Sequence, residues 1–249
     1  EGEEKFYPLL VILIGTIIGL GFAYDLFNLW VWFEAMAISS YMLVAFYRSQ
    51  ASSLEAGVKY LLQSAVGSVF VMFAVALVFG QTGALNYEAI RLAAKPNLML
   101  LAAGALFVIG FGVKTALVPL HTWLPDAHSQ APSGISAMLS GIVIETGLIA
   151  MLRALSTLVL TEYSWGPVIL GFGAVNMLLG NLMALRQTQV KRLLAYSSIS
   201  HMGYILLGIG AAITFGHANS AAGGFFHIIT HALMKGLAFL AAGTLLYSL

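Results

Sequence analysis

One lysine stands out among the residues that could do chemistry. Lys114 is the only charged residue in the apolar stretch Leu98–Leu120. An ammonium group at membrane depth costs about 2.5–3.5 kcal/mol on insertion scales, so it faces protein or water and usually marks an ion pathway. Pro119 clashes with the carbonyl of Thr115, which predicts that the helix kinks or ends just after the lysine. The alternative is a lysine that extends from the end of its span to the interface.

Glu34 is the natural opposite charge, because it falls near the middle of the apolar run Leu26–Tyr47. Burial disfavours the ionised form of a carboxyl group, and a nearby cation restores it. A pair of Glu34 and Lys114 whose spacing changes with conformation could therefore take up and release protons. A neutral carboxyl group that is hydrogen-bonded between helices is the alternative interpretation.

A third ionisable site lies within another apolar run. Glu145 sits in the middle of Pro132–Leu155, where it carries the same insertion cost as Glu34. Arg153 follows two helical turns later, so a structural ion pair between these two residues is an open alternative.

Histidines supply the remaining candidates. His227, His231 and Lys235 recur every four residues and so share one helical face, which suits a stepwise proton relay because imidazole titrates near neutral pH. His201 lies early in another span, among serine and tyrosine hydroxyl groups. Packing hydrogen bonds between helices are one alternative. A zinc site is another, although the sequence offers no acidic third ligand nearby.

The connection after Lys114 is polar and rich in proline. It contains Pro119, His121, Asp126 and His128 around Trp123. A metal site is one interpretation. A structural or gating loop that folds back at the membrane interface accounts better for the prolines and the tryptophan.

The composition predicts helices that position these residues inside a bilayer. The chain is 60% hydrophobic and 8% charged, with a mean hydropathy of +0.92. Soluble domains carry roughly 25% charged residues, and barrel strands would be shorter and alternating. We therefore predict an all-α, polytopic transmembrane bundle that forms a single transmembrane domain. About eight spans are expected near Tyr7–Tyr24, Leu26–Tyr47, Lys59–Phe79, Leu98–Val118, Pro132–Leu155, Gly166–Leu185, Leu193–Phe215 and Ala221–Leu249.

Several classes of function are excluded. The chain has no cysteine, which rules out thiolate metal sites and cysteine-ligated iron–sulfur clusters in this chain. The net charge of +1 and the lack of a basic cluster argue against nucleic acid as a partner. The sequence also lacks a P-loop, a nucleophile elbow and a dinucleotide-binding motif. The opening Glu-Gly-Glu-Glu-Lys is no signal peptide, so we expect the chain to begin inside a longer protein.

Several motifs together resemble a known family. The run from Gly112 to His128, with Lys114, Pro119 and the sequence His-Thr-Trp-Leu-Pro-Asp-Ala-His, is similar to the signature of antiporter-like membrane subunits. These subunits occur in respiratory complex I, in Mrp-type cation/proton antiporters and in membrane-bound hydrogenases. Further matches are Trp32-Phe33-Glu34, the stretch from Lys191 to Tyr204, and the stretch from His227 to Gly243.

The resemblance implies a fold of about fourteen helices with two inverted five-helix repeats, of which this chain covers helices four to eleven. Residues 1–155 would form the first repeat, and residues 166–249 an incomplete second one. Glu34 would modulate Lys114 on a broken helix, and His227, His231 and Lys235 would belong to the polar central axis. Glu145 departs from the family pattern, which usually has lysine or histidine at this position.

The predicted function is that of a proton-translocating subunit in an energy-converting complex of the NADH-quinone oxidoreductase type, located in a bacterial or archaeal plasma membrane or an organellar inner membrane. We expect no cofactor or metal in this chain, and we expect other membrane subunits and peripheral redox subunits with flavin, iron–sulfur clusters and quinone as partners. The alternatives are a sodium/proton antiporter subunit of the Mrp type and a non-transporting membrane scaffold. The predicted proton pathway comprises Glu34, Lys114, Glu145, His201, His227, His231 and Lys235.

Overall fold

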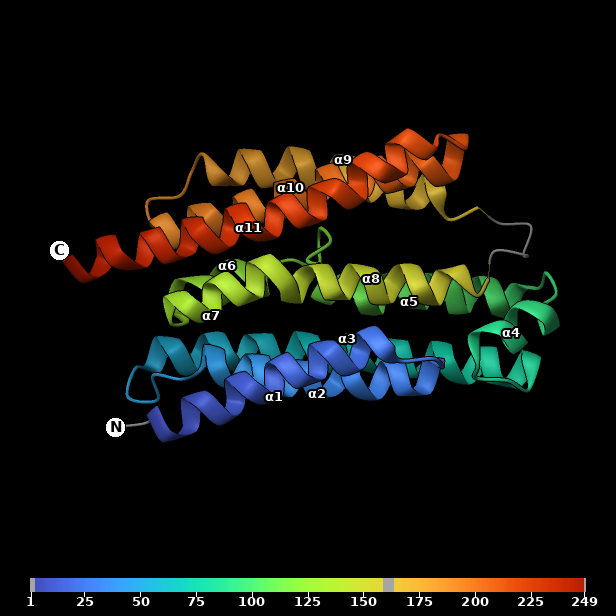
Figure 1. Ribbon diagram of the computed structural model, residues 1–249, viewed down its shortest axis with the longest axis horizontal. Coiled ribbons are helices and arrows are strands. Elements are labelled where there is room, and N and C mark those ends of the chain that lie inside the picture. The colour runs from blue at the N-terminus through green and yellow to red at the C-terminus, as the bar shows by residue number, and fades with distance from the viewer. Residues whose placement is uncertain (1–2, 159–163, 249) are drawn as a thin grey trace. The chain divides into compact units, whose positions relative to one another are not determined.

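The computed structural model describes residues 3–158 and 164–248, and this part of the chain is helical with no strand (Figure 1). Among the residues that the structure describes, seven helical segments are long and apolar enough to cross a membrane, and Leu98–Lys114 is a shorter apolar helix. The prediction of an all-helical transmembrane bundle is therefore confirmed. The helices are α1 Glu3–Phe22, α2 Leu26–Val44, α3 Ala51–Thr82, α4 Tyr87–Ala93, α5 Leu98–Lys114, α6 Trp123–Gln130, α7 Ser133–Met138, the π-helical turn η1 Leu139–Val143, α8 Ile144–Ser156, α9 Gly166–Ala184, α10 Val190–Phe215 and α11 Ala218–Ser248.

The described chain forms two compact units that interleave along the sequence. Unit 1 contains α1, most of α2, α3 from Leu61 onward, α4, α5 and α8 after Glu145. Unit 2 contains the first part of α3, the segment from Ala116 to Glu145, and α9 to α11. This division cuts across the predicted boundary between two inverted repeats, which stays a prediction.

Short polar side chains begin three helices of unit 1, namely α2, α4 and α5. Asn86 accepts hydrogen bonds from two backbone N–H groups in the first turn of α4, and Asn97 accepts one in the first turn of α5. Asp25 accepts from the N–H of Asn28 at the start of α2. Such caps satisfy donors that the helix itself leaves unpaired, so they fix where each helix begins.

Close contacts between helices in unit 1 depend on glycine. A Cβ atom on Gly67 would lie 2.8 Å from the carbonyl oxygen of Gly110, and a Cβ atom on Gly19 would lie 2.5 Å from the ring of Trp32. Small residues let membrane helices approach closely enough for dispersion contacts and weak hydrogen bonds to hold them together. α3 packs on α5 in this way, and α1 packs on α2.

Arg153 closes the end of α1. Its guanidinium donates hydrogen bonds to the carbonyl oxygens of Leu20, Gly21 and Ala23, and it lies 5.2 Å from the centre of the Tyr87 ring. The last carbonyl groups of a helix have no partner within the helix, and a cation beside them also interacts favourably with the helix dipole. The structure thus gives Arg153 these partners, whereas the sequence left an ion pair with Glu145 open.

Arg153→Met is expected to reduce stability by about 1–3 kcal/mol, because hydrogen bonds to charged groups are among the stronger ones and methionine keeps only the apolar stem. Thermal denaturation in mild detergent measures the change. Arg186→Met is the matched control, since Arg186 is exposed. Equal stability of the two variants would contradict a capping role for Arg153.

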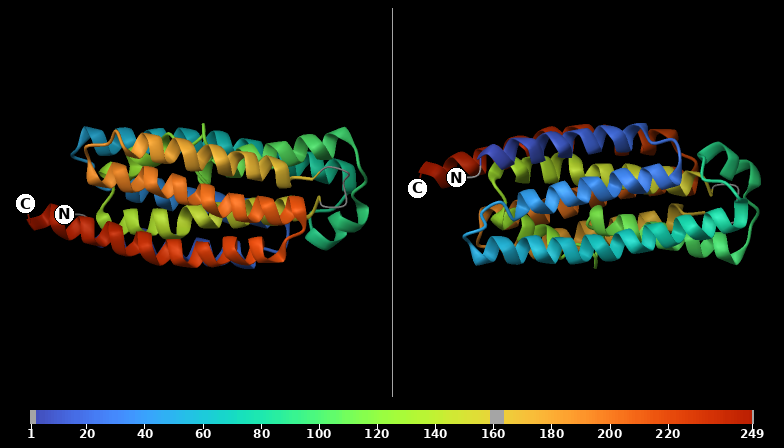
Figure 2. Two further views of the ribbon diagram at one scale, coloured as in Figure 1. Left: turned by 90° about the horizontal axis from the view of Figure 1, so that it is seen from above. Right: turned by 90° about the horizontal axis from the view of Figure 1, so that it is seen from below.

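Unit 2 is built around α10, which lies beside α9 and α11 (Figures 1 and 2). Glycines again permit the contact: a Cβ atom on Gly203 would lie 2.5 Å from the backbone nitrogen of Met177, and one on Gly173 would lie 2.8 Å from that of Leu207. The backbones of α9 and α10 therefore approach each other directly. One face of α10 is therefore buried against α9 and α11.

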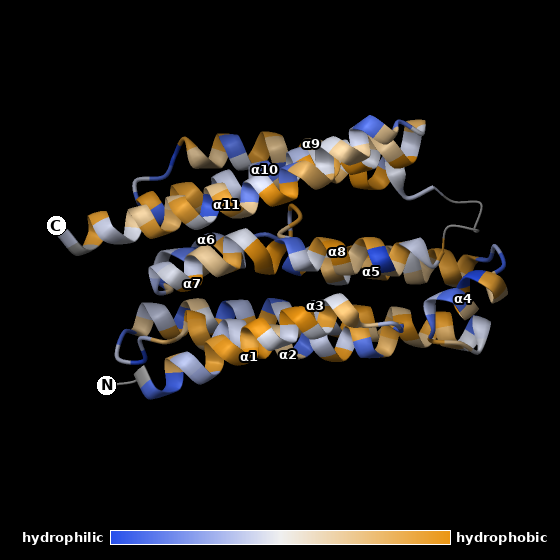
Figure 3. Cartoon of the chain, in the orientation of Figure 1, coloured by the Kyte–Doolittle hydropathy of each residue, from blue (hydrophilic) through white to orange (hydrophobic). Residues whose placement is uncertain are grey.

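The outer surfaces of the spans are apolar. Large side chains on α11, such as Phe226, Leu233 and Leu237, are 67–72% exposed, and apolar residues run along the length of the spans (Figure 3). Isolated exposed apolar residues are ordinary in any protein. Their density here matches surfaces that contact lipid or other membrane helices.

Two short helices were not predicted from the sequence, namely α4 and α6. Each is too brief to give an apolar run. All eight predicted spans correspond to helical segments, with ends that agree or differ by up to eight residues, and the predicted end at Leu249 lies outside the described residues. The helix that contains Lys114 ends there rather than at Val118.

Candidate functional site

The helix that carries Lys114 stops at that residue, and a break just after the lysine is what Pro119 predicted. Thr115 caps α5, and residues 115–122 form turns before α6 begins at Trp123. Ala116 adopts a left-handed conformation with φ of 57°, which is uncommon for a residue with a Cβ atom. The peptide bond between Val118 and Pro119 is cis. This segment is an irregular backbone between two helical pieces.

Asn176 of α9 holds this irregular backbone. Its side-chain oxygen accepts a hydrogen bond from the N–H of Val118 at 2.8 Å, and its amide nitrogen donates to the carbonyl of Ala116 at 3.1 Å. Asn176 and Ala116 are fully buried. Non-helical backbone inside a membrane requires protein partners for its polar groups, and this amide supplies two of them.

Lys114 is enclosed within unit 1. Its side chain is 1% exposed, and Nζ donates a hydrogen bond to Oγ of Ser40 on α2 at 3.1 Å. The carboxylate of Glu34, on the same helix as Ser40, interacts with Lys114 electrostatically. Gly147 of α8 approaches the aliphatic part of the lysine, since a Cβ atom there would lie 3.0 Å from Lys114 Cβ. The structure thus brings the predicted Glu34 and Lys114 into one site.

Glu145 belongs to unit 2 and contacts a histidine. Its Oε1 lies 2.7 Å from Nδ1 of His231, and the side chains are 7% and 0% exposed. The π-helical turn η1 ends one residue before α8 begins, just ahead of Glu145. A π turn adds one residue, which rotates the following side chains by roughly 100° relative to an unbroken α-helix. This turn therefore helps to set the direction of Glu145.

The histidines of unit 2 form a chain of contacts. His201 Nδ1 lies 3.1 Å from His227 Nε2, and the rings of His201 and His231 lie 5.5 Å apart. Lys235 is 2% exposed, and its Nζ donates to the carbonyl of Leu194 at 3.3 Å. The predicted face of α11 thus meets both Glu145 and His201. Among the residues that the structure describes, no group of three or more metal-ligating side chains is suited to hold a metal ion.

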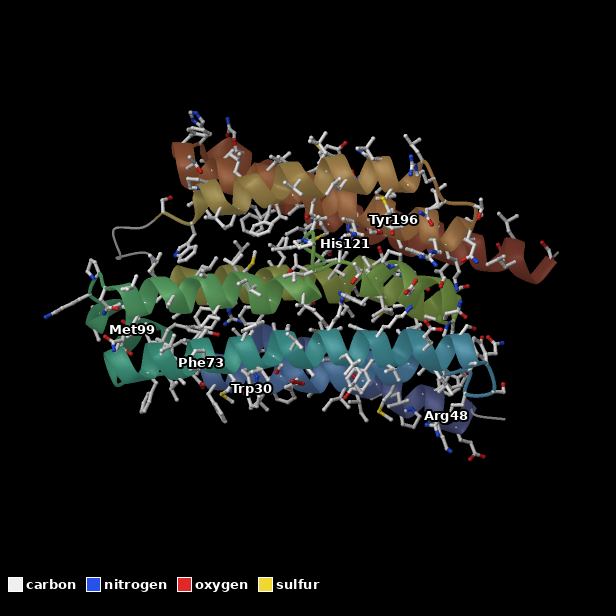
Figure 4. All side chains as sticks on the ribbon, turned by 180° about the vertical axis from the view of Figure 1, so that it is seen from behind. Trp30, Arg48, Phe73, Met99, His121 and Tyr196 are labelled. Carbon is white, nitrogen blue, oxygen red and sulfur yellow. The ribbon has the colours of Figure 1, made fainter. Side chains whose placement is uncertain are left out.

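The predicted loop residues pack within unit 2. His121 lies beside Tyr196 of α10, with ring centres 6.3 Å apart (Figure 4). Trp123 stacks on Tyr60 at 3.9 Å. His128 is fully buried, stacks on Phe239 at 4.5 Å, and neither of its ring nitrogens has a hydrogen-bond partner within the described parts of the chain.

Asp126 of α6 joins three helices through ion pairs. It forms ion pairs with Lys59 of α3 at 3.0 Å and with Arg192 of α10 at 3.1 Å. These residues line a polar surface pocket of about 200 Å³ together with Ser52, Glu55, Ala56, Ser129 and Gln130. The network ties α6 to its neighbours, in keeping with a structural or gating segment.

The sequence analysis did not single out three polar residues as site candidates, namely Ser40, Asn176 and Lys191. Lys191 Nζ donates a hydrogen bond to the carbonyl of Ala131 at 2.5 Å. A buried asparagine in an apolar run was the best available signal, because polar groups in membrane helices usually have partners. Nothing local in the sequence distinguishes Ser40 from its neighbour Ser39.

Residues 23–249 match the model of a protein family described as NADH:quinone oxidoreductase/Mrp antiporter, transmembrane. The chain belongs to this family. Hydrogenase-4 component B of Escherichia coli (strain K12) is 36% identical over 94% of this chain. NADH-quinone oxidoreductase subunit N 2 of Roseiflexus castenholzii is 39% identical over 84% of this chain. Both matches cover less than half of the relative, namely 36% and 44% of its length.

The likeness extends to solved structures. A chain from the membrane-bound sulfane sulfur reductase, an archaeal respiratory membrane complex, matches with a TM-score of 0.87 and 35% identity over 95% of this chain and 48% of that chain. Membership of the NADH:quinone oxidoreductase/Mrp antiporter family confirms the resemblance that the motifs around Lys114 indicated. The individual roles of the site residues remain predictions.

Proposed function

We propose that this chain belongs to a proton-translocating, antiporter-like subunit of a membrane energy-converting complex. The observation that carries the proposal is the burial of ionisable side chains within apolar helices. Lys114, Glu145, His231 and Lys235 are each 0–5% exposed. Such groups are costly to bury and are retained in membrane proteins mainly where they move ions or protons.

The Glu34–Lys114 site would take up a proton and release it as the interaction between the two charges changes. The cluster of Glu145, His201, His227, His231 and Lys235 would relay protons in unit 2, because neighbouring imidazoles can accept and donate in turn. Moving one proton against roughly 100 mV costs about 2.3 kcal/mol, which a changing buried ion pair can supply.

The driving reaction would come from partner subunits. The relatives' names include an NADH-quinone oxidoreductase subunit and a hydrogenase component, which favours partners that carry flavin, iron–sulfur clusters or quinone. The family description also names Mrp antiporters, so sodium/proton exchange is the second candidate. Because the carboxylate of Glu145 is occupied by His231, proton transport is favoured over sodium binding at this position.

Lys114→Ala tests the proposal in the full-length protein within its native complex. Mass spectrometry first identifies the subunits of the purified assembly. Proton uptake is then driven by an electron donor if redox subunits copurify, or by a sodium gradient if only small membrane subunits do. We expect the variant to assemble normally and to lose proton uptake into vesicles. Normal uptake would overturn the proposal, and loss of assembly together with uptake would favour a scaffold role.

A further inference from the structure

The hydrogen bond between Lys114 and Ser40 links the lysine to a hydroxyl group in addition to Glu34. Lys114 Nζ donates to Ser40 Oγ at 3.1 Å, and both side chains are buried, at 1% and 0% exposure. α2 also contacts α5 about two helical turns before Ser40, where Phe33 and Phe111 pack edge to face with ring centres 5.0 Å apart. The contact is thus part of a close interface within unit 1.

The orientation of the Ser40 hydroxyl favours a protonated lysine. Ser40 Oγ donates its own proton to the carbonyl of Ala37 at 2.8 Å. The lone pairs of the oxygen are therefore left to accept. An ammonium group can only donate, and charge-assisted hydrogen bonds are roughly twice as strong as neutral ones. The contact with Ser40 thus stabilises the ammonium more than the neutral amine.

Few other ionisable groups can act on Lys114 within the described part of unit 1. On α2 these are Glu34, which interacts with Lys114, and Tyr41, which interacts with Glu34. α3 has no ionisable side chain between Leu61 and Thr82, and α5 has none besides Lys114. On the part of α8 that belongs to unit 1, Arg153 is bound to the end of α1.

Ser40 follows Glu34 by six residues on α2, which is about 9 Å along the helix axis. We propose that Ser40 is a second partner of the transported charge, a neutral acceptor that keeps the Lys114 ammonium hydrogen-bonded when its interaction with Glu34 weakens. Ser40 is a positioning residue that acts through Lys114. This inference rests on the proposed function of the Glu34–Lys114 site.

The chain offers a matched control one residue away. Ser39 is also buried, at 2% exposure, and its hydroxyl donates to carbonyl oxygens of its own helix at 3.0 and 3.1 Å. Ser39→Ala therefore removes the same atom from the same helix without touching Lys114. Ser40→Thr retains the hydroxyl group.

The experiment measures proton uptake against pH by the full-length protein in its native complex, with wild type and the three variants Ser40→Ala, Ser40→Thr and Ser39→Ala. Without its acceptor, the protonated lysine is less favoured, so the alkaline limb of the profile should move to lower pH by about one unit in Ser40→Ala. Ser40→Thr should restore the wild-type profile, and Ser39→Ala should match it throughout.

Identical profiles for Ser40→Ala and Ser39→Ala would overturn the inference. If Ser40→Ala does not assemble, Ser40→Cys replaces it, because a thiol is similar in size and a weaker acceptor. Lys114→Ala distinguishes failure of the proposed function from failure of the proposed role of Ser40. Uptake by Lys114→Ala would refute the proposed function, whereas loss of uptake there with an unmoved Ser40→Ala profile would refute only the role of Ser40.

Discussion

Glu145→Ala is expected to abolish proton uptake and to destabilise the full-length subunit in its native complex. The carboxylate lies 2.7 Å from Nδ1 of His231, and Nε2 of that ring has no other hydrogen-bond partner in the described residues. Removing the carboxyl group leaves a buried imidazole nitrogen without its hydrogen-bond partner, which costs about 1–3 kcal/mol. Thermal denaturation in detergent and proton uptake into vesicles measure the two effects.

Glu145→Gln separates hydrogen bonding from proton exchange at this position. The amide oxygen can still accept from the imidazole, so stability should change by about 1 kcal/mol or less. An amide cannot take up a proton near neutral pH, and loss of a proton-transfer group typically costs about 100-fold or more in rate. We therefore expect Glu145→Gln to assemble as wild type and to transport at a small fraction of its rate.

Glu88→Gln is the control, since Glu88 is exposed on α4 and the substitution changes the total charge equally. A double variant of Glu145→Ala and His231→Ala should be more stable than the sum of the single changes predicts, because the two residues are in contact. Wild-type uptake by Glu145→Gln would show that the contact is purely structural.

Composition and hydropathy were sufficient to predict the helical spans, because a helix in lipid needs a long apolar run. The break after Lys114 was predictable from Pro119, whose effect on the preceding turn is local. The end of α5 at the lysine itself required the structure. The π-helical turn before Glu145 left no mark in composition, since it changes only the register of an apolar segment.

The contacts within the site were beyond the reach of the sequence, because they join residues far apart in the chain. Glu145 and His231 are 86 positions apart, and Lys114 and Ser40 are 74 apart. The sequence indicated which side chains were costly to bury, and therefore in need of partners. It offered Arg153 as a possible partner of Glu145 and did not indicate His231, since that contact depends on helix packing.

Asn176→Leu is expected to cause the second large effect, through the irregular backbone that follows Lys114. The substitution keeps roughly the volume of the side chain but removes both hydrogen bonds, to the N–H of Val118 and to the carbonyl of Ala116. Each buried backbone group left without a partner costs about 1–3 kcal/mol. We expect a loss of about 2–6 kcal/mol in stability, measured by thermal denaturation, together with reduced proton uptake.

Asn181→Leu makes the same substitution on the same helix at an exposed position and should leave both properties nearly unchanged. Asn176→Asp retains the acceptor for Val118 but loses the donor to Ala116, so it should fall between wild type and Asn176→Leu. Asn176→Leu with the stability of Asn181→Leu would contradict this account of the break. We expect Asn176 to affect proton uptake through Lys114 because the two are linked along the chain. The backbone that Asn176 holds begins at Ala116, two residues after the lysine.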